Sequence, residues 1–423
     1  MKIVLTCFGS LGDVNPYLAI AKELQVRGHS PLIAGDEVFR KHITTEGIAF
    51  HSVRPDCTPF MNSTEFFRKG MDKKEGLSFI LSSILFPSLR GMYEDSRAAL
   101  EGADLVVTHQ LSFGAHLALE QTNTPWVSTV LAPAGFVSTY DFPVMGEMPA
   151  IKYLRHLGPR AMRTLLGQAK KRFDLQLEPY YAFRKELGLP HGKNPLMEGH
   201  HSPTKVLGLF SPLLAKVQPD YPSNTTVTGF CPFDGFEGSE MPAELEAFLS
   251  KGGAPLVFSL GSAAVNCAEG FFDRSIEVVK RVQRRAVFLV GKNSDVYPKK
   301  PLGKNIIAVP YAPYSKLFPR VCAIIASGGI GTVSQIMASG KPCLILPFAH
   351  DQYDNADRLC RLGVGRSLQM EGYTPLHGAA EILRLVGENL YPSRAKEVAE
   401  LIAQEQGTKL ACDEIEATLG KRR

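Results

Sequence analysis

The segment Ala323-Ile-Ile-Ala-Ser-Gly-Gly-Ile-Gly-Thr332 joins a short apolar run to a glycine-rich turn that opens a helix. An apolar run without polar alternation is typical of a parallel strand covered on both faces. The glycines let the backbone approach a ligand closely, and the first N–H groups of the following helix have no partner within it. Together with the helix dipole, these groups predict a site for an anion such as a diphosphate.

The same order of strand, turn and helix recurs on both sides of this segment. In the C-terminal half we expect strands over Leu256–Leu260, Ala286–Val290, Cys322–Ala326 and Cys343–Leu346, and helices over Phe272–Val282, Gly331–Ala338 and Asn355–Leu362. In the N-terminal half we expect strands over Ile3–Cys7, Pro31–Ala34, Asp104–Thr108 and Trp126–Leu131, and helices over Pro16–Arg27 and Phe113–Thr122. Two such blocks predict an α/β protein of two Rossmann-like, doubly wound domains with parallel sheets.

The length of 423 residues agrees with two domains. We assign residues 1–228 to the N-terminal domain, 229–239 to a linker rich in glycine, proline and acidic residues, and 240–392 to the C-terminal domain. We expect residues 393–423 to form C-terminal helices that cross back to the N-terminal domain.

The composition indicates a folded globular chain and argues against several other classes. Hydrophobic residues make up 44% and charged residues 21%, enough for a full core. The net charge of +5 is too mild, without a recognisable motif, to indicate a nucleic-acid partner. The 8 cysteines are scattered without a CxxC pair, so we expect reduced thiols and a cytoplasmic protein. We expect no signal peptide, and the apolar stretch Leu77–Leu89, which contains Pro87, is too short to span a membrane.

Two further groups of polar residues follow predicted strands. The turn Gly9-Ser-Leu-Gly-Asp-Val-Asn-Pro16 follows the first strand and lacks the GxGxxG pattern of a dinucleotide site. The residues His350, Asp351 and Gln352 follow the strand Cys343–Leu346, and in an open parallel sheet they lie at the same edge as the predicted anion site. A carboxylate beside an amide suits hydrogen bonds from sugar hydroxyls.

These motifs resemble the nucleotide-sugar site of family 1 glycosyltransferases of the GT-B fold, in which two domains face each other across a cleft. Gly328-Gly-Ile-Gly-Thr332, His350-Asp-Gln-Tyr-Asp-Asn-Ala356 and Arg361-Leu-Gly-Val-Gly365 are most similar to bacterial members of the rhamnosyltransferase B and sterol glucosyltransferase kind, with an N-terminal domain of the glycosyltransferase 28 type. The resemblance covers the whole chain, and its specific motifs lie in the C-terminal half.

The resemblance implies a role for each matching residue on the donor side. It places Tyr311 against the nucleobase, Ser262 at a phosphate, Gly328, Gly329, Gly331 and Thr332 around the diphosphate, and Asp351 and Gln352 at the sugar. The family has a histidine immediately before the paired glycines, whereas this chain has Ser327, which cannot become cationic. Stabilisation of the leaving diphosphate is then weaker, or it is shared with Lys292 or His350.

The resemblance also places the catalytic base at Asp13, which takes the proton of an acceptor hydroxyl as that hydroxyl attacks the anomeric carbon. The alternative is that Asp13 only caps the helix that follows it. A second hypothesis pairs Asp13 with His109, at the end of the strand Asp104–Thr108; its alternative is an ordinary hydrogen-bonded histidine at a strand end.

The acceptor side is less defined. Phe79, Leu85 and Phe86 are candidates to line a lipophilic acceptor site or are ordinary core, and Asp141 lies on a loop that is a candidate acceptor contact. The segment Ile151–Arg172 has seven Lys and Arg residues and no acidic residue. It is either a solvated helical hairpin or a contact for an anionic membrane surface or an anionic acceptor.

The expected function is therefore that of an inverting hexosyltransferase. It moves glucose or rhamnose from a UDP- or dTDP-sugar to a hydroxyl of a hydrophobic small molecule or lipid. We expect no cofactor and no metal, since no DxD motif occurs where this fold would need one and His200-His201 lacks further ligands nearby. We expect the cytoplasm as its location, with peripheral contact at the inner membrane face as an addition. Two alternatives stay open: a helper subunit without catalysis, and a sugar-nucleotide epimerase of the same fold.

Overall fold

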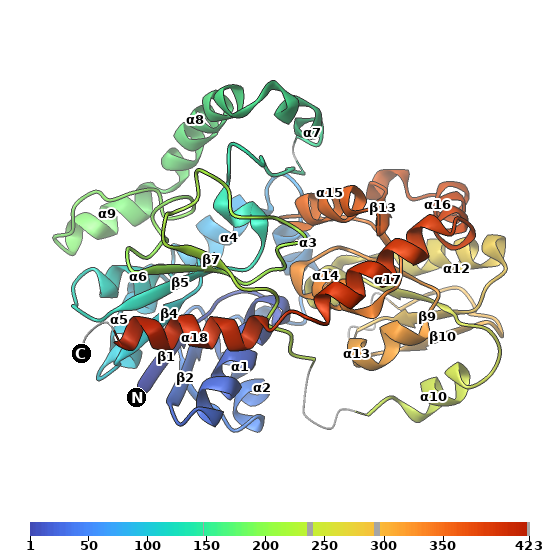
Figure 1. Cartoon of the computed structure of the whole chain (residues 1–423), viewed down its shortest axis with the longest axis horizontal. Coiled ribbons are helices and arrows are strands. Elements are labelled where there is room, and N and C mark those ends of the chain that lie inside the picture. Colours follow the sequence, from blue (N-terminus) through green and yellow to red (C-terminus); the bar gives the residue numbers. More distant parts are fainter. Residues whose placement is uncertain (147, 235–239, 292–296, 421–423) are drawn as a thin grey trace.

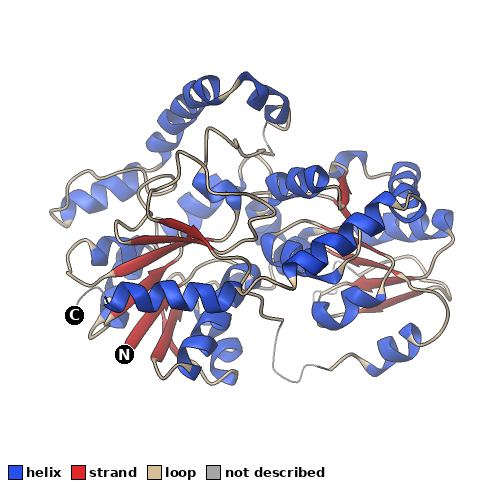
Figure 2. Cartoon of the chain, viewed as in Figure 1, coloured by secondary structure: helices blue, strands red, loops and turns tan. Residues whose placement is uncertain are grey.

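The computed structural model describes residues 1–146, 148–234, 240–291 and 297–420, and it contains two parallel β-sheets with helices around each (Figures 1 and 2). Strand residues alternate between two packed faces. In β1 (Lys2–Thr6), Ile3 and Leu5 join the core cluster beneath helix α1 (Leu11–Val26), whereas Val4 joins the cluster beneath α5 (Leu89–Leu100) and α6 (Phe113–Leu119). Because both faces are buried, the strand has no polar alternation, as its sequence predicted.

The N-terminal sheet has the order β3-β2-β1-β4-β5-β6-β7, and every neighbouring pair is parallel. Its further strands are β2 (Ser30–Gly35), β3 (Ala49–Ser52), β4 (Leu105–Thr108), β5 (Trp126–Val130), β6 (Lys205–Gly208) and β7 (Thr225–Val227). The order along the chain reverses between β1 and β4. In open parallel sheets ligands bind outside the carboxyl ends of the strands at such a reversal, and Asp13 and His109 follow these two strands.

The C-terminal sheet has the order β10-β9-β8-β11-β12-β13, again fully parallel. Its strands are β8 (Leu256–Ser259), β9 (Ala286–Leu289), β10 (Ile306–Val309), β11 (Ala323–Ala326), β12 (Cys343–Ile345) and β13 (Gly365–Ser367). Here the reversal lies between β8 and β11. Ser262 follows the first of these strands and Ser327 the second.

The helices connect the strands and cover the sheets (Figure 2). In the N-terminal domain the other α-helices are α2 (Arg40–Thr45), α3 (Thr64–Gly70), α4 (Gly76–Ile80), α7 (Ile151–Leu154), α8 (Pro159–Gln176) and α9 (Glu178–Glu186), and a π-helical turn spans Leu81–Leu85. The C-terminal half contains α10 (Ala243–Leu249), α11 (Gly261–Ala264), α12 (Phe271–Val282), α13 (Tyr314–Leu317), α14 (Ile330–Ser339), α15 (Gln352–Leu362), α16 (Pro375–Gly387), α17 (Leu390–Ile402) and α18 (Gly407–Gly420).

The predicted fold class is confirmed. The predicted helices over Phe272–Val282 and Asn355–Leu362 occur as α12 and α15, and the helix predicted over Phe113–Thr122 ends earlier, at Leu119. The strands that the sequence did not predict, β3, β6, β7, β10 and β13, lie at or near the sheet edges and have three or four residues each. Such short segments carry too little periodicity to stand out.

The two C-terminal helices have different partners. Helix α17 contacts α14 of the C-terminal domain, whereas α18 lies along α1 of the N-terminal domain (Figure 1). Arg27 at the end of α1 bonds to Asp413 and Glu416 of α18 at 2.6 and 2.8 Å. Of the expected linker, Gly229–Asp234 is described and begins with buried Phe230 and Cys231; residues 235–239 lie outside the described part.

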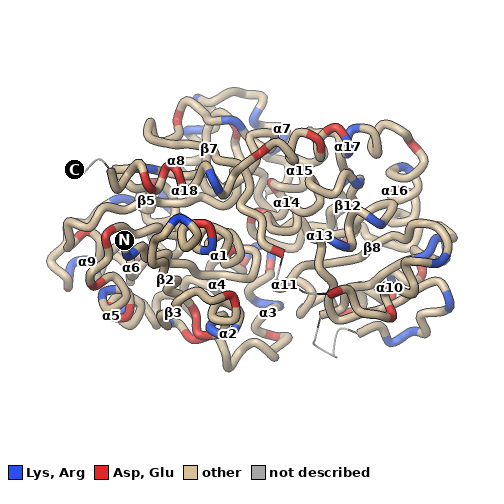
Figure 3. Tube along the Cα trace, turned by 60° about the horizontal axis from the view of Figure 1, so that its bottom comes forward, with Lys and Arg blue, Asp and Glu red and all other residues tan. Residues whose placement is uncertain are grey.

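All eight cysteines are free thiols. No helix among the described residues has the length and apolar character required to cross a bilayer. Basic and acidic residues are interspersed along both domains, so the net charge of +5 does not gather on one of them (Figure 3).

Candidate active site

The two predicted loops meet at the junction of the domains. A Cβ built on Gly331, in the first turn of α14, would lie 3.1 Å from the Cα of Gly12, in the first turn of α1. Residues without side chains at both positions let the two helix N-termini approach this closely. The candidate base and the candidate diphosphate loop therefore lie side by side, although about 320 residues separate them in the sequence.

Asp13 is held by its own helix. Its Oδ2 accepts hydrogen bonds from the N–H and the hydroxyl of Ser10 at 2.7 and 3.0 Å, while the Ser10 hydroxyl accepts from the N–H of Gly12. This is a capping box, which fixes the start of α1. Gly9 has φ +135°, and a Cβ there would lie 2.4 Å from Asp13 Oδ2, so that carboxylate requires glycine at position 9.

The second oxygen of Asp13 faces His109. The distance from Oδ1 to His109 Nε2 is 3.9 Å, too long for a hydrogen bond but close enough for electrostatic attraction. His109 Nδ1 accepts from the N–H of Leu111 at 3.2 Å, which places the imidazole proton on Nε2, toward Asp13. Burial lowers the pKa of His109, so the ring is neutral at pH 7 and offers an N–H to the carboxylate. The geometry therefore allows both the pair and the hydrogen-bonded strand-end histidine.

The glycine-rich loop between β11 and α14 has the backbone that an anion site needs. Gly328 has φ +90°, and a Cβ there would lie 2.6 Å from Ile345 Cγ2, so only glycine fits. No side chain caps the ten-residue helix α14. The N–H groups of its first turn are therefore available to a ligand.

The side chain of Ser327 is buried and points into the protein interior. Its buried hydroxyl donates to the carbonyl oxygen of Leu260 at 2.8 Å and so ties the end of β11 to the end of β8. Gly261, with φ +73°, follows Leu260, and a Cβ there would lie 3.6 Å from the hydroxyl oxygen of Thr332; the next residue, Ser262, is exposed. The Thr332 side chain bonds to the Tyr314 hydroxyl. Ser327 thus shapes the loop, while Ser262 stands open beside it.

Asp351 and Gln352 begin helix α15 beside this loop. Asp351 Oδ2 accepts a bond of 2.7 Å from the Asn355 Nδ2 group, which also donates to the Gly328 carbonyl oxygen at 2.9 Å. Burial, with a further contribution from the charge of Asp13, raises the pKa of Asp351 to about 7. Gln352 Oε1 accepts from the Phe348 N–H at 2.8 Å, so its NH₂ group is the part that remains for a ligand.

Asn355 is a site residue to which the sequence analysis gave no role. It is fully buried and joins the carboxylate of Asp351 to Gly328 of the candidate diphosphate loop. Its spacing of four residues from Asp351, at the start of a helix, is the pattern that places both on one face.

His350 crosses the junction. It adopts a left-handed backbone with φ +55°, and its Nε2 donates to the carbonyl oxygen of Gly70 at the end of α3, 2.8 Å away. Burial lowers its pKa. His350 therefore links the C-terminal half to the segment after α3. Lys292, the other candidate to replace the missing histidine, lies outside the described residues.

Tyr311 follows β10 and is exposed at the same edge of the C-terminal sheet. Burial of its hydroxyl, with the charge of Asp234, raises its pKa to about 12, so the ring is neutral. Asp234 also accepts from the N–H groups of Tyr314 and Ser315 at 3.1 and 2.7 Å and thereby fixes this loop. An exposed, neutral aromatic ring here suits stacking on a nucleobase.

The candidate acceptor residues separate into different surroundings. Leu85 is fully buried in the core, and Phe86 stacks on Phe113 of that core, so both belong to packing, one of the two alternatives. Phe79 is half-buried and contacts Phe66 of α3 edge-to-face. Of these three residues, Phe79 on α4 is the one that lies nearest in sequence to Gly70, the residue that His350 contacts.

Asp141 has partners in the other domain. Its carboxylate accepts from Arg358 and, at 3.3 Å, from Arg361, both on α15. Arg358 is 1% exposed and also bonds to Asp354 at 2.6 Å and to the carbonyl oxygen of Leu214 at 3.1 Å. The loop of Asp141 therefore contacts helix α15, and the Asp141 carboxylate is occupied by these arginines rather than available to an acceptor.

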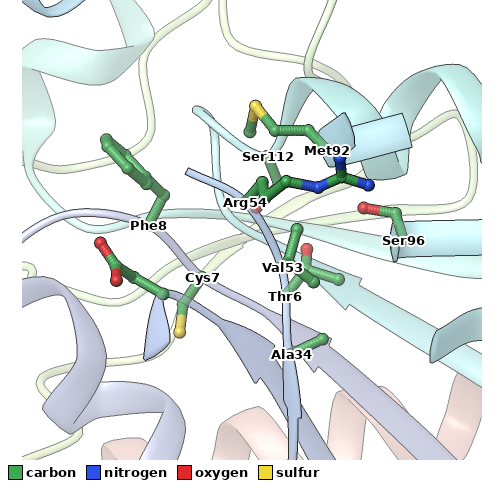
Figure 4. Close-up of a pocket in the computed structure, with 10 residues that line it drawn as sticks. Thr6, Cys7, Phe8, Ala34, Val53, Arg54, Met92, Ser96 and Ser112 are labelled. Atoms are coloured by element: carbon green, nitrogen blue, oxygen red, sulfur yellow. The ribbon is translucent and has the colours of Figure 1, made fainter. Parts of the chain in front are cut away.

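A small cavity lies beside the turn after β1 (Figure 4). Its volume is about 10 Å³, and Thr6, Cys7, Phe8 and Arg54 are among the residues that line it. The Thr6 hydroxyl is buried without a hydrogen-bond partner among the described residues. This space suits one water molecule and is too small for an acceptor.

Comparison with known proteins identifies both halves. Residues 3–85 match the glycosyltransferase family 28 N-terminal domain, and residues 281–416 match the C-terminal domain of proteins like erythromycin biosynthesis protein CIII. An O-mycaminosyltylonolide 6-deoxyallosyltransferase of Streptomyces fradiae is 28% identical over 98% of this chain and 97% of its own. Sterol 3-beta-glucosyltransferases of Arabidopsis thaliana and Leptosphaeria maculans are 26% and 27% identical, and the chain spans 64% and 29% of their lengths.

Solved structures share the whole fold. The glycosyltransferase of kitacinnamycin has a TM-score of 0.72 at 20% identity, with 99% of each chain covered. The glycosyltransferase VinC, solved in complex with dTDP, has a TM-score of 0.70 at 18% identity, with 100% of each chain covered. Both have the two-domain GT-B architecture. The two matched domains, with this shared architecture, identify the chain as a glycosyltransferase of the GT-B fold.

Proposed function

We propose that this glycosyltransferase moves a hexose from a UDP- or dTDP-sugar to a hydroxyl of a hydrophobic small molecule or lipid, with inversion at the anomeric carbon. The observation that carries the proposal is the contact between the first turns of α1 and α14 at Gly12 and Gly331. Through this contact, Asp13 lies opposite the N-terminus of α14, which has no side-chain cap. Asp351 is close enough for the charge of Asp13 to raise its pKa.

In this proposal Asp13 is the general base. The acceptor oxygen attacks the anomeric carbon and passes its proton to Asp13 Oδ1, the oxygen that the capping box does not use. His109 presents a neutral N–H to the same oxygen and orients it. Attack from the side opposite the leaving group inverts the configuration.

The departing diphosphate is stabilised by backbone rather than by a cationic side chain. As the bond from the anomeric carbon to the phosphate oxygen breaks, negative charge grows on that oxygen. The N–H groups and the dipole of α14 stabilise this charge, together with the Ser262 hydroxyl. Ser327 shapes the loop through Leu260, and Thr332 completes it.

The sugar is positioned by Asp351 and Gln352, and Tyr311 stacks on the nucleobase. An ionised Asp351 accepts hydrogen bonds from sugar hydroxyls, and the Gln352 NH₂ group donates one. We propose that the reaction needs no metal ion; retained activity in the presence of EDTA tests this point.

The acceptor class rests on two kinds of relative. One is named for transfer to a macrolide intermediate, O-mycaminosyltylonolide, and others are named for transfer to sterols. Both are largely apolar molecules with a hydroxyl. We propose a cytoplasmic enzyme that takes an acceptor of this kind.

The decisive experiment compares Asp13→Asn with Ser10→Ala. The full chain is incubated with UDP-glucose or dTDP-rhamnose and a panel of sterols and macrolide aglycones, and products are detected by mass spectrometry. If Asp13 is the base, Asp13→Asn lowers kcat by about 10²–10⁴-fold, whereas Ser10→Ala costs only about 1 kcal/mol of stability. If Asp13 is only a cap, both variants lose stability, but the folded fraction of each keeps the kcat of the unmodified chain.

The same assay separates the alternatives. A helper subunit shows no turnover when it is pure, and an epimerase changes the donor sugar without any acceptor. NMR of the product reports the anomeric configuration, and retention would contradict direct displacement.

A further inference from the structure

The end of the helical hairpin above the junction exposes apolar side chains. Tyr153, Leu154 and Leu157 are 67%, 42% and 68% exposed, and they lie close together in sequence over α7 and the turn that follows. Helices α7 and α8 project from the body of the N-terminal domain (Figure 1). A single exposed leucine needs no explanation, but a group of large apolar side chains on a projecting end indicates a contact surface.

Basic residues precede and follow these side chains in the sequence. Lys152 lies over the Tyr153 ring at 5.1 Å, and Arg160 and Arg163 are exposed on the first turns of α8 without an ion pair among the described residues. By contrast, Arg155, toward the body, pairs with Asp357 at 2.7 Å. No acidic residue occurs from 151 to 172, so all the charged side chains that this stretch itself contributes are basic.

We propose that this docking face, made of Lys152, Tyr153, Leu154, Leu157, Arg160 and Arg163, binds the surface of an anionic lipid bilayer. Apolar side chains that enter the headgroup region, flanked by unpaired Lys and Arg, are the composition that peripheral membrane contacts use. A stable protein partner would need about 800 Å² of matched surface per side, and three apolar side chains on a projecting end do not supply it.

The inner side of the hairpin is tied to the donor helix. Ile151 and Met162 pack with Phe142 and Tyr353, and Tyr353 lies on α15 directly after Asp351 and Gln352. The ion pair of Arg155 with Asp357 adds a second tie to α15. Bilayer contact would therefore hold the catalytic junction in one orientation at the lipid surface, where a lipophilic acceptor resides. This step rests on the proposed function.

The test is co-sedimentation of the full chain with vesicles. One set contains equal parts phosphatidylcholine and phosphatidylglycerol, and the other contains phosphatidylcholine alone. We expect binding to the anionic set only, weakening as salt rises. Arg160→Gln with Arg163→Gln should weaken partitioning about 25-fold, since each basic residue near the surface contributes about 1 kcal/mol. Leu154→Ser with Leu157→Ser should weaken it about tenfold.

Matched controls exist on the C-terminal domain. Arg281→Gln with Arg284→Gln makes the same change of charge at exposed positions, and Leu376→Ser with Leu383→Ser removes comparably exposed leucines from α16. Both controls should bind as the unmodified chain does. Equal binding to the two vesicle sets, or equal losses in controls and docking-face variants, would overturn the proposal.

Turnover of a water-soluble acceptor separates this proposal from the proposed function. Docking-face variants should keep that turnover and lose acceleration by anionic vesicles with a lipid acceptor. If the unmodified chain binds vesicles but transfers no sugar, the proposed function fails and the docking face stands. Capture of a second protein that the docking-face variants lose, without any vesicle binding, would assign the face to a protein partner and overturn the lipid proposal.

Discussion

At the scale of single residues, the capping role of Asp13 and its proposed role as the base use different carboxylate oxygens, so the two do not exclude each other. One carboxylate oxygen caps α1 through Ser10, and the other faces His109 and the opposite domain. The cap holds the carboxylate in one rotamer, so the structural role supports the catalytic one.

Replacing Asp13 should change how donor binding depends on pH. The charge of Asp13 contributes to raising the pKa of Asp351 to about 7, so donor binding by ionised Asp351 weakens as pH falls below about 7. In Asp13→Asn this contribution disappears, the pKa of Asp351 falls, and binding persists to lower pH. Calorimetric titration with the nucleotide sugar at a series of pH values measures the shift. Ser10→Ala keeps the charge and should show none; an unshifted Asp13→Asn would contradict the coupling.

Removing the imidazole of His109 should slow turnover less than removing Asp13 does. A hydrogen bond to a charged group contributes about 1.5–3 kcal/mol, and the attraction between His109 and Asp13 across 3.9 Å is weaker than that, so His109→Ala should lower kcat by no more than about tenfold, with little change in the donor KM. His109→Gln, which retains an N–H donor, should restore part of the rate. Unchanged kcat in His109→Ala would remove the residue from the mechanism and leave it as a strand-end histidine.

Sequence could place residues at the carboxyl ends of strands, because apolar runs and glycine turns are local. This is why Asp13, Ser327 and Asp351 were found at the correct edges. It could not show that Ser327 donates to Leu260, that Asn355 joins Asp351 to Gly328, or that Leu85 is core. Those facts depend on contacts between distant strands.

At the scale of elements, helix α15 contacts two different parts of the protein. Its start carries Asp351 and Asn355 against the diphosphate loop, and its outer side carries Asp354, Arg358 and Arg361 against the loop of Asp141. One helix thus connects the candidate donor site to the contact between the domains. The sequence showed the first side by its motif. It gave no sign of the second, since the partner of Arg358 lies 217 residues away.

Two arginines of α15 should differ sharply in importance. Arg358→Gln leaves buried Asp354 without a cation and leaves Asp141 with Arg361 alone, so it should cost about 3–5 kcal/mol of stability. Arg361 is 41% exposed, and Arg361→Gln should cost less than about 1 kcal/mol. Thermal unfolding measures both values. If Arg358→Gln stays folded, its donor KM should also rise; equal stability of the two variants would contradict the role of the buried group.

At the scale of the whole molecule, alternation of strands and helices predicted two parallel sheets, but the docking of the domains was beyond it. The N-terminal domain also holds polar groups that no sequence pattern marked. His116 and His200 are buried and His201 is half-buried, and each has at least one ring nitrogen lacking a partner among the described residues. Burial lowers the pKa of His116 to about 3 and that of His201 to about 4, and it lowers the pKa of His200 well below its usual value.

These histidines should make the domain sensitive to acid. Their pKa is depressed on folding, so the unfolded chain takes up protons first as pH falls below about 6.5. Stability is therefore full above that pH and is lost on the way toward pH 4. His201→Gln should shift the acid-unfolding midpoint, followed by circular dichroism, to lower pH. His191→Gln, at an exposed position, should leave it unchanged. A midpoint that does not move in His201→Gln would assign the acid transition to other groups.

The crossing of α18 onto α1 bears on how hybrids of such enzymes are built. A chimera spliced at residues 229–239 would place a foreign α18 against the native α1 and separate Arg27 from Asp413 and Glu416. The Cys412 thiol, which points at the Ile20 carbonyl oxygen, would be lost with them. A donor-domain transplant is therefore better spliced twice, with the second junction before Gly407, so that the last helix stays with the half on which it rests.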